Sequence, residues 1–139
     1  MRAIKNVLTM VMAIAAGTML CASLASAAGL NGMKKAGADI NVCLVDEDGM
    51  TLYMYKKDSP GKSTCGAANG CLEKWPIFYV DEFKHAAGFD PASFAVINRE
   101  DGKKQITYKG MPLYYFSRDK TADDYLGQGF DNVWHVARP

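Results

Sequence analysis

The side chains that could perform acid–base or nucleophilic chemistry are few in this chain of 139 residues. It has two histidines, His85 and His135, and no serine stands in the G-x-S-x-G pattern that exposes a hydrolase nucleophile. Cys43 and His135 could form a thiol–imidazole pair, but nothing in the neighbouring sequence supports one. Clustered acidic residues at Asp46–Asp48 and Asp123–Asp124 lie in polar segments, where solvation explains them. The sequence therefore predicts a protein that is not an enzyme.

Soft metal ligands are the second chemistry that the residue types allow. Copper binds thioether, thiol and imidazole groups, and the candidate ligands are Met50, Met111, His135 and Cys43. Met50 and Met111 occupy equivalent places in two similar segments, but no M-x-x-M or H-x-x-M pair occurs. No cofactor is predicted, and a copper site is kept as an alternative.

A ten-residue segment occurs twice and organises the rest of the chain. It reads GMTLYMYKKD at 49–58 and GMPLYYFSRD at 110–119, and each copy is followed by a polar loop and a tryptophan. Two such units could pack around a pseudo-twofold axis and bury both aromatic sets in one core. The equivalent pairs are Gly49 and Gly110, Leu52 and Leu113, Tyr53 and Tyr114, Tyr55 and Phe116, Asp58 and Asp119, and Trp75 and Trp134.

The residues of this repeat are predicted to be structural. Alternate side chains of a strand share a face, so Tyr53 and Tyr55 should both face the core, and so should their equivalents. Asp58 and Asp119 end the two segments, where a carboxylate can accept hydrogen bonds from the backbone of the following loop. The alternative is that the two aspartates face a ligand.

The pattern of short apolar runs and turn residues predicts a mainly β, small single domain of two pseudo-repeated short-strand units with little helix. A hairpin is expected over 40–56, a three-stranded meander over 93–117 and a closing strand at 132–137. A further strand is expected at 77–80, after a single helical turn that ends before Pro76.

The first 27 residues have the features of a secretory signal peptide, which are basic residues, a short apolar run and small residues at its end. Cleavage is expected near Ala27, which would place the protein in the periplasm or outside the cell. Residues 28–38 are predicted to be a flexible segment. Residues 39–139 are predicted to form the β domain, with repeats at about 40–80 and 94–139.

Charge and the amino-terminal cysteine limit the partners that are expected. Removal of the leader lowers the formal charge from +1 to −1, because Arg2 and Lys5 are lost. Without a basic field, nucleic acid is not expected as a partner. Membrane association would require lipidation of Cys21, and bulky Leu20 before this cysteine argues against that.

Three cysteines follow the predicted leader, which favours one disulfide and one remaining thiol in an oxidising compartment. Cys65 and Cys71 enclose the flexible loop GAANG and are the expected pair. Cys43 lies in an apolar run and is expected to be a buried thiol. A disulfide between Cys43 and either other cysteine is the alternative.

The doubled pattern Y-x-(F/W/Y)-x-x-D resembles a bacterial family of exported proteins and predicted lipoproteins, sometimes called the secreted repeat of unknown function. The likeness extends to CLEKWP, to DGKKQITYKG and to GQG before VWHV. It implies an exported, twofold-repeated β module, often lipid-anchored, and no established activity. The sequence departs from the family in the poor lipidation signal, the longer loop between Cys65 and Cys71, and Ile77, where a second proline is common.

These observations predict an exported, non-enzymatic binding or accessory module of the bacterial periplasm or cell envelope. Its partner would be an envelope protein or a small ligand. A periplasmic copper or redox accessory protein is the alternative, and an envelope enzyme is the less favoured one.

Overall fold

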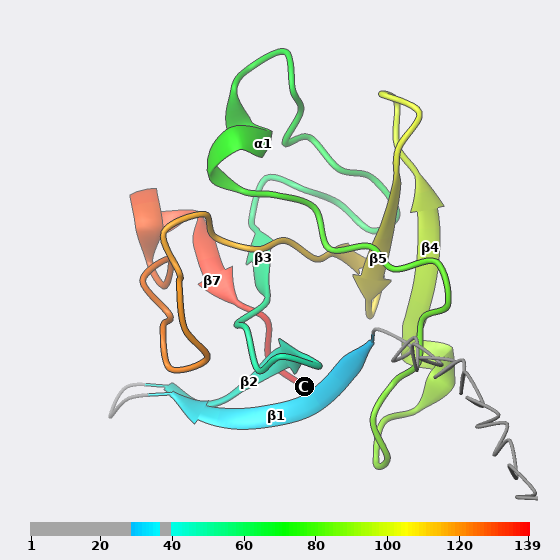
Figure 1. The fold of residues 1–139 in the computed structure, drawn as a ribbon. Coiled ribbons are helices and arrows are strands. Elements are labelled where there is room, and N and C mark those ends of the chain that lie inside the picture. The colour runs from blue at the N-terminus through cyan, green and yellow to red at the C-terminus, as the bar shows by residue number, and fades with distance from the viewer. Residues whose placement is uncertain (1–28, 37–39) are drawn as a thin grey trace, which may run out of the picture.

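The computed structural model describes residues 29–36 and 40–139, and this part of the chain is mainly strand with little helix, as predicted (Figure 1). The predicted signal peptide, its cleavage site and Cys21 lie outside the described residues. The strands are β1 Leu30–Ala36, β2 Ile40–Asp46, β3 Tyr53–Tyr55, β4 Phe94–Asn98, β5 Lys104–Tyr108, β6 Met111–Pro112 and β7 Trp134–Val136. The helical turns are α1 Cys71–Lys74, η1 Pro91–Ser93 and η2 Phe130–Asn132.

The strands form three small antiparallel sheets, β1-β2, β3-β7 and β4-β5-β6. In Figure 1, β1 and β2 curve along the lower edge, β3 and β7 lie in the middle, and β4 and β5 stand on the right. The meander predicted over 93–117 and the closing strand at 132–137 are confirmed.

Two of the predicted strand arrangements differ from the structure. The hairpin begins as expected, with Val45 bridging Thr51, but β3 then leaves β2 and pairs with β7. Residues 77–80 form no regular strand, because Phe78 donates its N–H to Leu113 and accepts from Ile106, which are different neighbours.

The folded part begins before Asp39, where it was expected to begin. β1 lies within the segment predicted to be flexible, and it pairs with β2 over its length, with irregular register at two places. Antiparallel pairing uses backbone groups, so a glycine-rich segment without hydrophobic alternation can still form a strand.

The two repeats are related by a pseudo-twofold axis that passes between Tyr53 and Tyr114. These equivalent residues lie opposite each other and exchange two backbone hydrogen bonds, with N to O distances of 2.8 and 2.9 Å. The ten-residue segment of each repeat also pairs with the residues beside the tryptophan of the other repeat. Neither repeat is therefore a separate unit. The equivalent bonds run from Lys56 N to Val133 O and from Ser117 N to Lys74 O, at 2.8 and 2.9 Å.

A stack of four aromatic rings fills the core at this axis. Trp75 and Trp134 are parallel, with ring centroids 3.8 Å apart, and lie at its centre. Phe116 stacks on Trp75 at 4.3 Å, and Tyr55 stacks on Trp134 at 4.2 Å. Each outer ring therefore contacts the tryptophan of the other repeat, and the stack joins the two repeats.

The repeated glycines stand where a side chain would strain the backbone. Gly49 and Gly110 have φ of +81° and +83°, in the left-handed region that favours glycine. A Cβ on Gly49 would lie 3.0 Å from the Cβ of Ala122, and one on Gly110 would lie 3.2 Å from the Cβ of Pro60. Each turn thus fits closely against a loop of the other repeat.

The predicted disulfide between Cys65 and Cys71 is confirmed, with a Cα–Cα distance of 5.3 Å. Cys43 is not part of it and is fully buried in the aromatic core. The loop before the disulfide is held further by Arg99, whose Nη2 donates to the carbonyl oxygen of Cys65 at 2.6 Å.

Replacing both Cys65 and Cys71 by serine is expected to lower the free energy of unfolding by about 2 kcal/mol, because the disulfide closes only a short loop. Urea unfolding followed by tryptophan fluorescence would measure this. A loss equal to the whole stability would contradict it, because the loop would then be essential rather than supporting.

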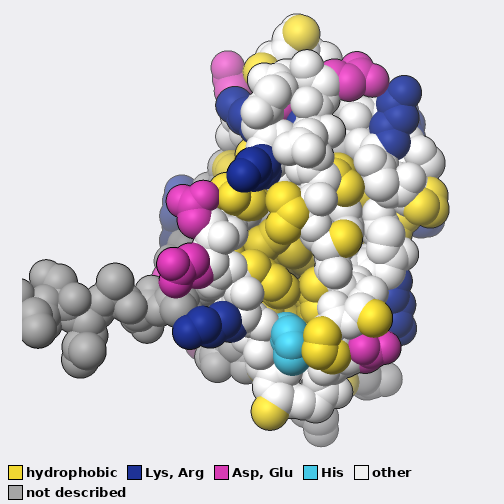
Figure 2. Space-filling view, turned by 90° about the vertical axis from the view of Figure 1, so that its right-hand side faces the viewer, with side chains coloured by type: hydrophobic (Ala, Val, Ile, Leu, Met, Phe, Trp, Pro, Cys, Tyr) yellow, Lys and Arg dark blue, Asp and Glu magenta, His cyan; other side chains and the backbone are white. Residues whose placement is uncertain are grey.

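One surface carries an apolar hollow. Figure 2, which faces the right-hand side of Figure 1, shows hydrophobic side chains gathered there, with charged side chains of both signs around the margin. β4 lies on this side and carries Val96, half of which is exposed.

Candidate functional site

The aspartates and tyrosines of the repeated motif bond to each other across the axis. The hydroxyl of Tyr53 donates to Oδ2 of Asp119 at 2.6 Å, and the hydroxyl of Tyr114 donates to Oδ2 of Asp58 at 2.7 Å. All four residues are buried. The motif therefore connects the repeats, and the sequence prediction missed this because it considered each copy by itself.

The other carboxylate oxygens fix the loops, as the sequence suggested. Oδ1 of Asp58 accepts from the backbone N–H of Thr64 at 2.7 Å, and Oδ1 of Asp119 accepts from that of Leu126 at 3.0 Å. Both oxygens of each carboxylate are engaged within the protein, so neither aspartate faces an outside ligand.

Burial and hydrogen bonding to carboxylates raise the pKa of three tyrosines well above the ordinary range. Burial is the larger cause for Tyr53 and Tyr115, with their bonds to Asp119 and Asp46 next. Tyr114 is also raised, first by burial, although its contact with Ser63 opposes the shift. All three hydroxyls thus stay protonated in the folded protein.

The stability of the fold is expected to fall as the pH rises above about 10, the ordinary tyrosine pKa. Above this pH the unfolded chain releases these protons while the folded chain retains them. Each such tyrosine therefore lowers the free energy of unfolding by about 1.4 kcal/mol per pH unit. Absorbance at 295 nm would detect this as tyrosines that ionise only together with unfolding. Their ionisation in a still folded protein near pH 10 would contradict the expectation.

The candidate copper ligands lie in different places. Cys43 is in the core, and Met50 lies in the turn after β2. Met111 and His135 line one cavity, which also contains Met54. Within residues 29–36 and 40–139, no group of three or more His, Cys, Asp or Glu side chains could hold a metal.

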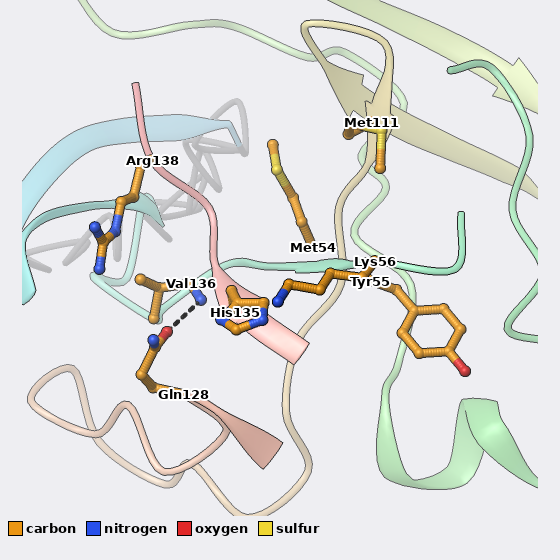
Figure 3. A pocket seen from close by; sticks show the side chains of 8 residues that line it. All are labelled: Met54, Tyr55, Lys56, Met111, Gln128, His135, Val136 and Arg138. Carbon is orange, nitrogen blue, oxygen red and sulfur yellow. Dashed lines mark hydrogen bonds between the residues drawn. The ribbon is translucent and has the colours of Figure 1, made fainter. Parts of the chain in front are cut away.

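This cavity, which we call the Met54 pocket, has a volume of about 480 Å³ and lies over β3, β6 and β7 (Figure 3). Its position follows from strand alternation, because Met54 and His135 are opposite each other in the β3-β7 sheet, on the face turned away from the tryptophans. The apolar lining residues are Met54, Tyr55, Met111 and Val136, and the polar ones are Lys56, Gln128, His135 and Arg138.

His135 has a lowered pKa and one ring nitrogen without a hydrogen-bond partner among the described residues. Burial is the main cause that lowers its pKa, and the positive charges of Lys56 and Arg138 lower it further. The ring bonds to the backbone of Asn132, whereas the buried Nε2 atom has no hydrogen-bond partner in the described structure. A buried polar atom without a partner is unfavourable, and a bound molecule could satisfy it.

Two exposed cations belong to the lining. Figure 3 shows the Lys56 side chain beside the His135 ring and Arg138 beyond Val136. Among the described residues, neither Lys56 nor Arg138 forms a salt bridge. Of the described residues that line the pocket, none carries a carboxylate.

The second repeat has a different side chain at the position of Met54. Tyr115 stands where the first repeat has Met54, and its hydroxyl donates to Oδ2 of Asp46 at 2.7 Å. The cavity beside it has a volume of about 140 Å³, and Glu47 and Asp48 also line it. At this position the repeats therefore differ, because Met54 borders the larger pocket and Tyr115 borders the smaller cavity.

Another hollow, of about 620 Å³, lies beside the disulfide loop, and Arg99 lines it. That guanidinium already donates to Gln105, Asp101 and the carbonyl of Cys65. Its donors are used to hold the loop, so this hollow is the weaker candidate.

The histidines are placed in different surroundings. The ring of His85 stacks on Phe94, while His135 lies in the Met54 pocket and its Nε2 contacts no hydroxyl or thiol of the described residues. The pocket could bind a molecule through apolar and positively charged contacts.

Comparison with family models gives a match to one described as a secreted repeat of unknown function, at residues 42–78 and 95–138. The two matched regions correspond to the two repeats and together cover more than half of the chain. The comparisons with curated proteins and with solved structures found no match. In the described part of the chain, every helix is too short to cross a membrane.

Proposed function

The chain belongs to the family of secreted repeats of unknown function, and we propose that it is a non-enzymatic binding module of the bacterial periplasm or cell envelope. The Met54 pocket is its ligand site. The protein acts after cleavage of its signal peptide near Ala27, without lipidation of Cys21. Intact-mass measurement on the exported protein would test cleavage and lipidation together, because an acylated or uncleaved chain would be heavier.

The observation that supports this proposal most directly is the pocket itself. Its volume of about 480 Å³ lies within the range of small-molecule sites, which are mostly apolar with a few polar groups. The motif aspartates are engaged in holding the repeats together, which leaves this cavity as the place where apolar and unpaired polar groups meet.

The test uses the methyl groups of Met54 and Met111, which report on the pocket by NMR after methionine labelling. A set of small acids, bases and neutral compounds is titrated into the exported protein. Saturable shifts of these two signals are expected for at least one compound. The proposal fails if no compound shifts them.

Met54→Tyr is the matched variant, because tyrosine already occupies the equivalent position in the second repeat. It should keep the fold, checked by near-ultraviolet circular dichroism, and abolish the shifts at Met111. Unchanged binding in a folded Met54→Tyr protein would place the ligand elsewhere.

Copper binding is a second candidate, favoured by Met54, Met111 and His135 in one pocket. The positive charges of Lys56 and Arg138 oppose a bound cation, and the volume exceeds that of a bare ion. Titration with Cu(I) against a chromophoric chelator decides this. Stoichiometric Cu(I) binding that is lost in the Met111→Leu variant would favour the copper site. A protein that fails to compete with the chelator for Cu(I) would reject it.

A further inference from the structure

We propose that the Met54 pocket binds a small apolar carboxylate, with its hydrocarbon part on the methionines and its carboxylate between Lys56 and Arg138. This inference rests on the proposed function and names the chemical class of the ligand. The experiment below decides whether the hydrocarbon part of the acid is aliphatic or aromatic.

The apolar half of the ligand follows from the floor of the pocket. Met54, Met111 and Val136 contribute hydrocarbon and thioether surface, and Met54 and Met111 are only partly buried. Methionine side chains are flexible and polarizable, so they adapt to apolar ligands of different shape. Covering this surface removes it from water, which favours binding.

The carboxylate of the ligand is inferred from the charged side chains of the pocket. Lys56 and Arg138 are the charged residues of the lining, and neither has a salt-bridge partner among the described residues. Both are exposed, so they can meet a carboxylate at the entrance without loss of an existing ion pair. The positive charge of the lining therefore comes from these two side chains and not from His135, whose pKa is lowered by burial and by their charges.

The second repeat supports the assignment by contrast. There Tyr115 takes the place of Met54, and the small cavity that Tyr115 borders is lined by three acidic residues. Ser117 stands in the place of Lys56. The residues that distinguish the two repeats at this position are thus the ones that open the pocket and make it positively charged.

The experiment titrates the exported protein with octanoate, 1-octanol and octylamine, which share one chain and differ in charge, and with 3-phenylpropanoate as the aromatic acid. Isothermal titration calorimetry gives affinity, and the methionine methyl signals give location. At least one acid should bind about tenfold or more tightly than the alcohol, a difference of about 1.4 kcal/mol. The amine should bind weakest.

The double variant Lys56→Met/Arg138→Met should lose this preference and bind the acid and the alcohol alike. Lys57→Met/Arg118→Met is the matched control, because it removes the same charge from exposed positions outside the pocket and should keep the preference. Equal binding of acid and alcohol by the unaltered protein, or tighter binding of the amine, would overturn the carboxylate assignment and leave the binding function standing. If none of the four compounds, nor the wider set, shifts the methionine signals, both proposals fail.

Discussion

Replacing both Asp58 and Asp119 by alanine is expected to lower the free energy of unfolding by about 6 kcal/mol, because each aspartate contributes about 3 kcal/mol. Each substitution removes charged hydrogen bonds that hold a loop. Asp119→Ala also leaves the hydroxyl of Tyr53 buried without an acceptor, and Asp58→Ala leaves that of Tyr114 with only Ser63 beside it. Small domains have only about 5–15 kcal/mol in total, so the double variant should be largely unfolded. Circular dichroism and urea titration would measure the loss.

The single variants and a double-mutant cycle separate the causes. Asp119→Ala should cost less when Tyr53 is already phenylalanine, because no hydroxyl then remains unpaired. Asp123→Ala, at an exposed position, is the control and should change stability by less than about 0.5 kcal/mol. A folded double variant of near-normal stability would show that the cross-repeat bonds are dispensable.

Trp75→Ala is expected to lower the free energy of unfolding by about 4 kcal/mol, a value typical of a large aromatic side chain removed from a core. Trp75 is 2% exposed and stacks between Phe116 and Trp134. Its removal leaves a cavity at the pseudo-twofold axis, where rings from both repeats meet. Urea unfolding followed by far-ultraviolet circular dichroism would measure the change.

Two variants test whether the stack is the cause. Trp75→Phe keeps an aromatic ring there and should recover part of the loss. Leu126→Ala removes an apolar side chain that is 60% exposed and should have little effect. A Trp75→Ala protein as stable as the Leu126→Ala protein would contradict the central role of the stack.

The fold was predictable where the sequence carries a local signal. Turn glycines and alternating apolar residues marked the meander and the closing strand, and the doubled segment predicted the paired repeats. β1 lacks such a pattern, since its pairing with β2 depends on backbone groups. Phe78 bonds to two separate neighbours, and an apolar run alone does not distinguish this from a strand.

The candidate site was less predictable because its residues come from three strands. Met111 and His135 were among the sequence candidates, but Met54 was not, and it reaches the pocket through the register of β3 with β7. That pairing is non-local. The signal was available in the comparison of the copies, since Met54 is opposite Tyr115 in an alignment of two otherwise similar segments.

The exchange of strands between the repeats also determines when the protein can fold during its synthesis. β3 takes β7 as its partner, and the whole β4-β5-β6 sheet lies between these two strands in the chain. The core rings of the first repeat therefore gain their partners only after the ribosome has made the residues of that sheet and then β7. A growing chain cannot close the shared core before β7 has emerged, so the first repeat does not fold ahead of the second.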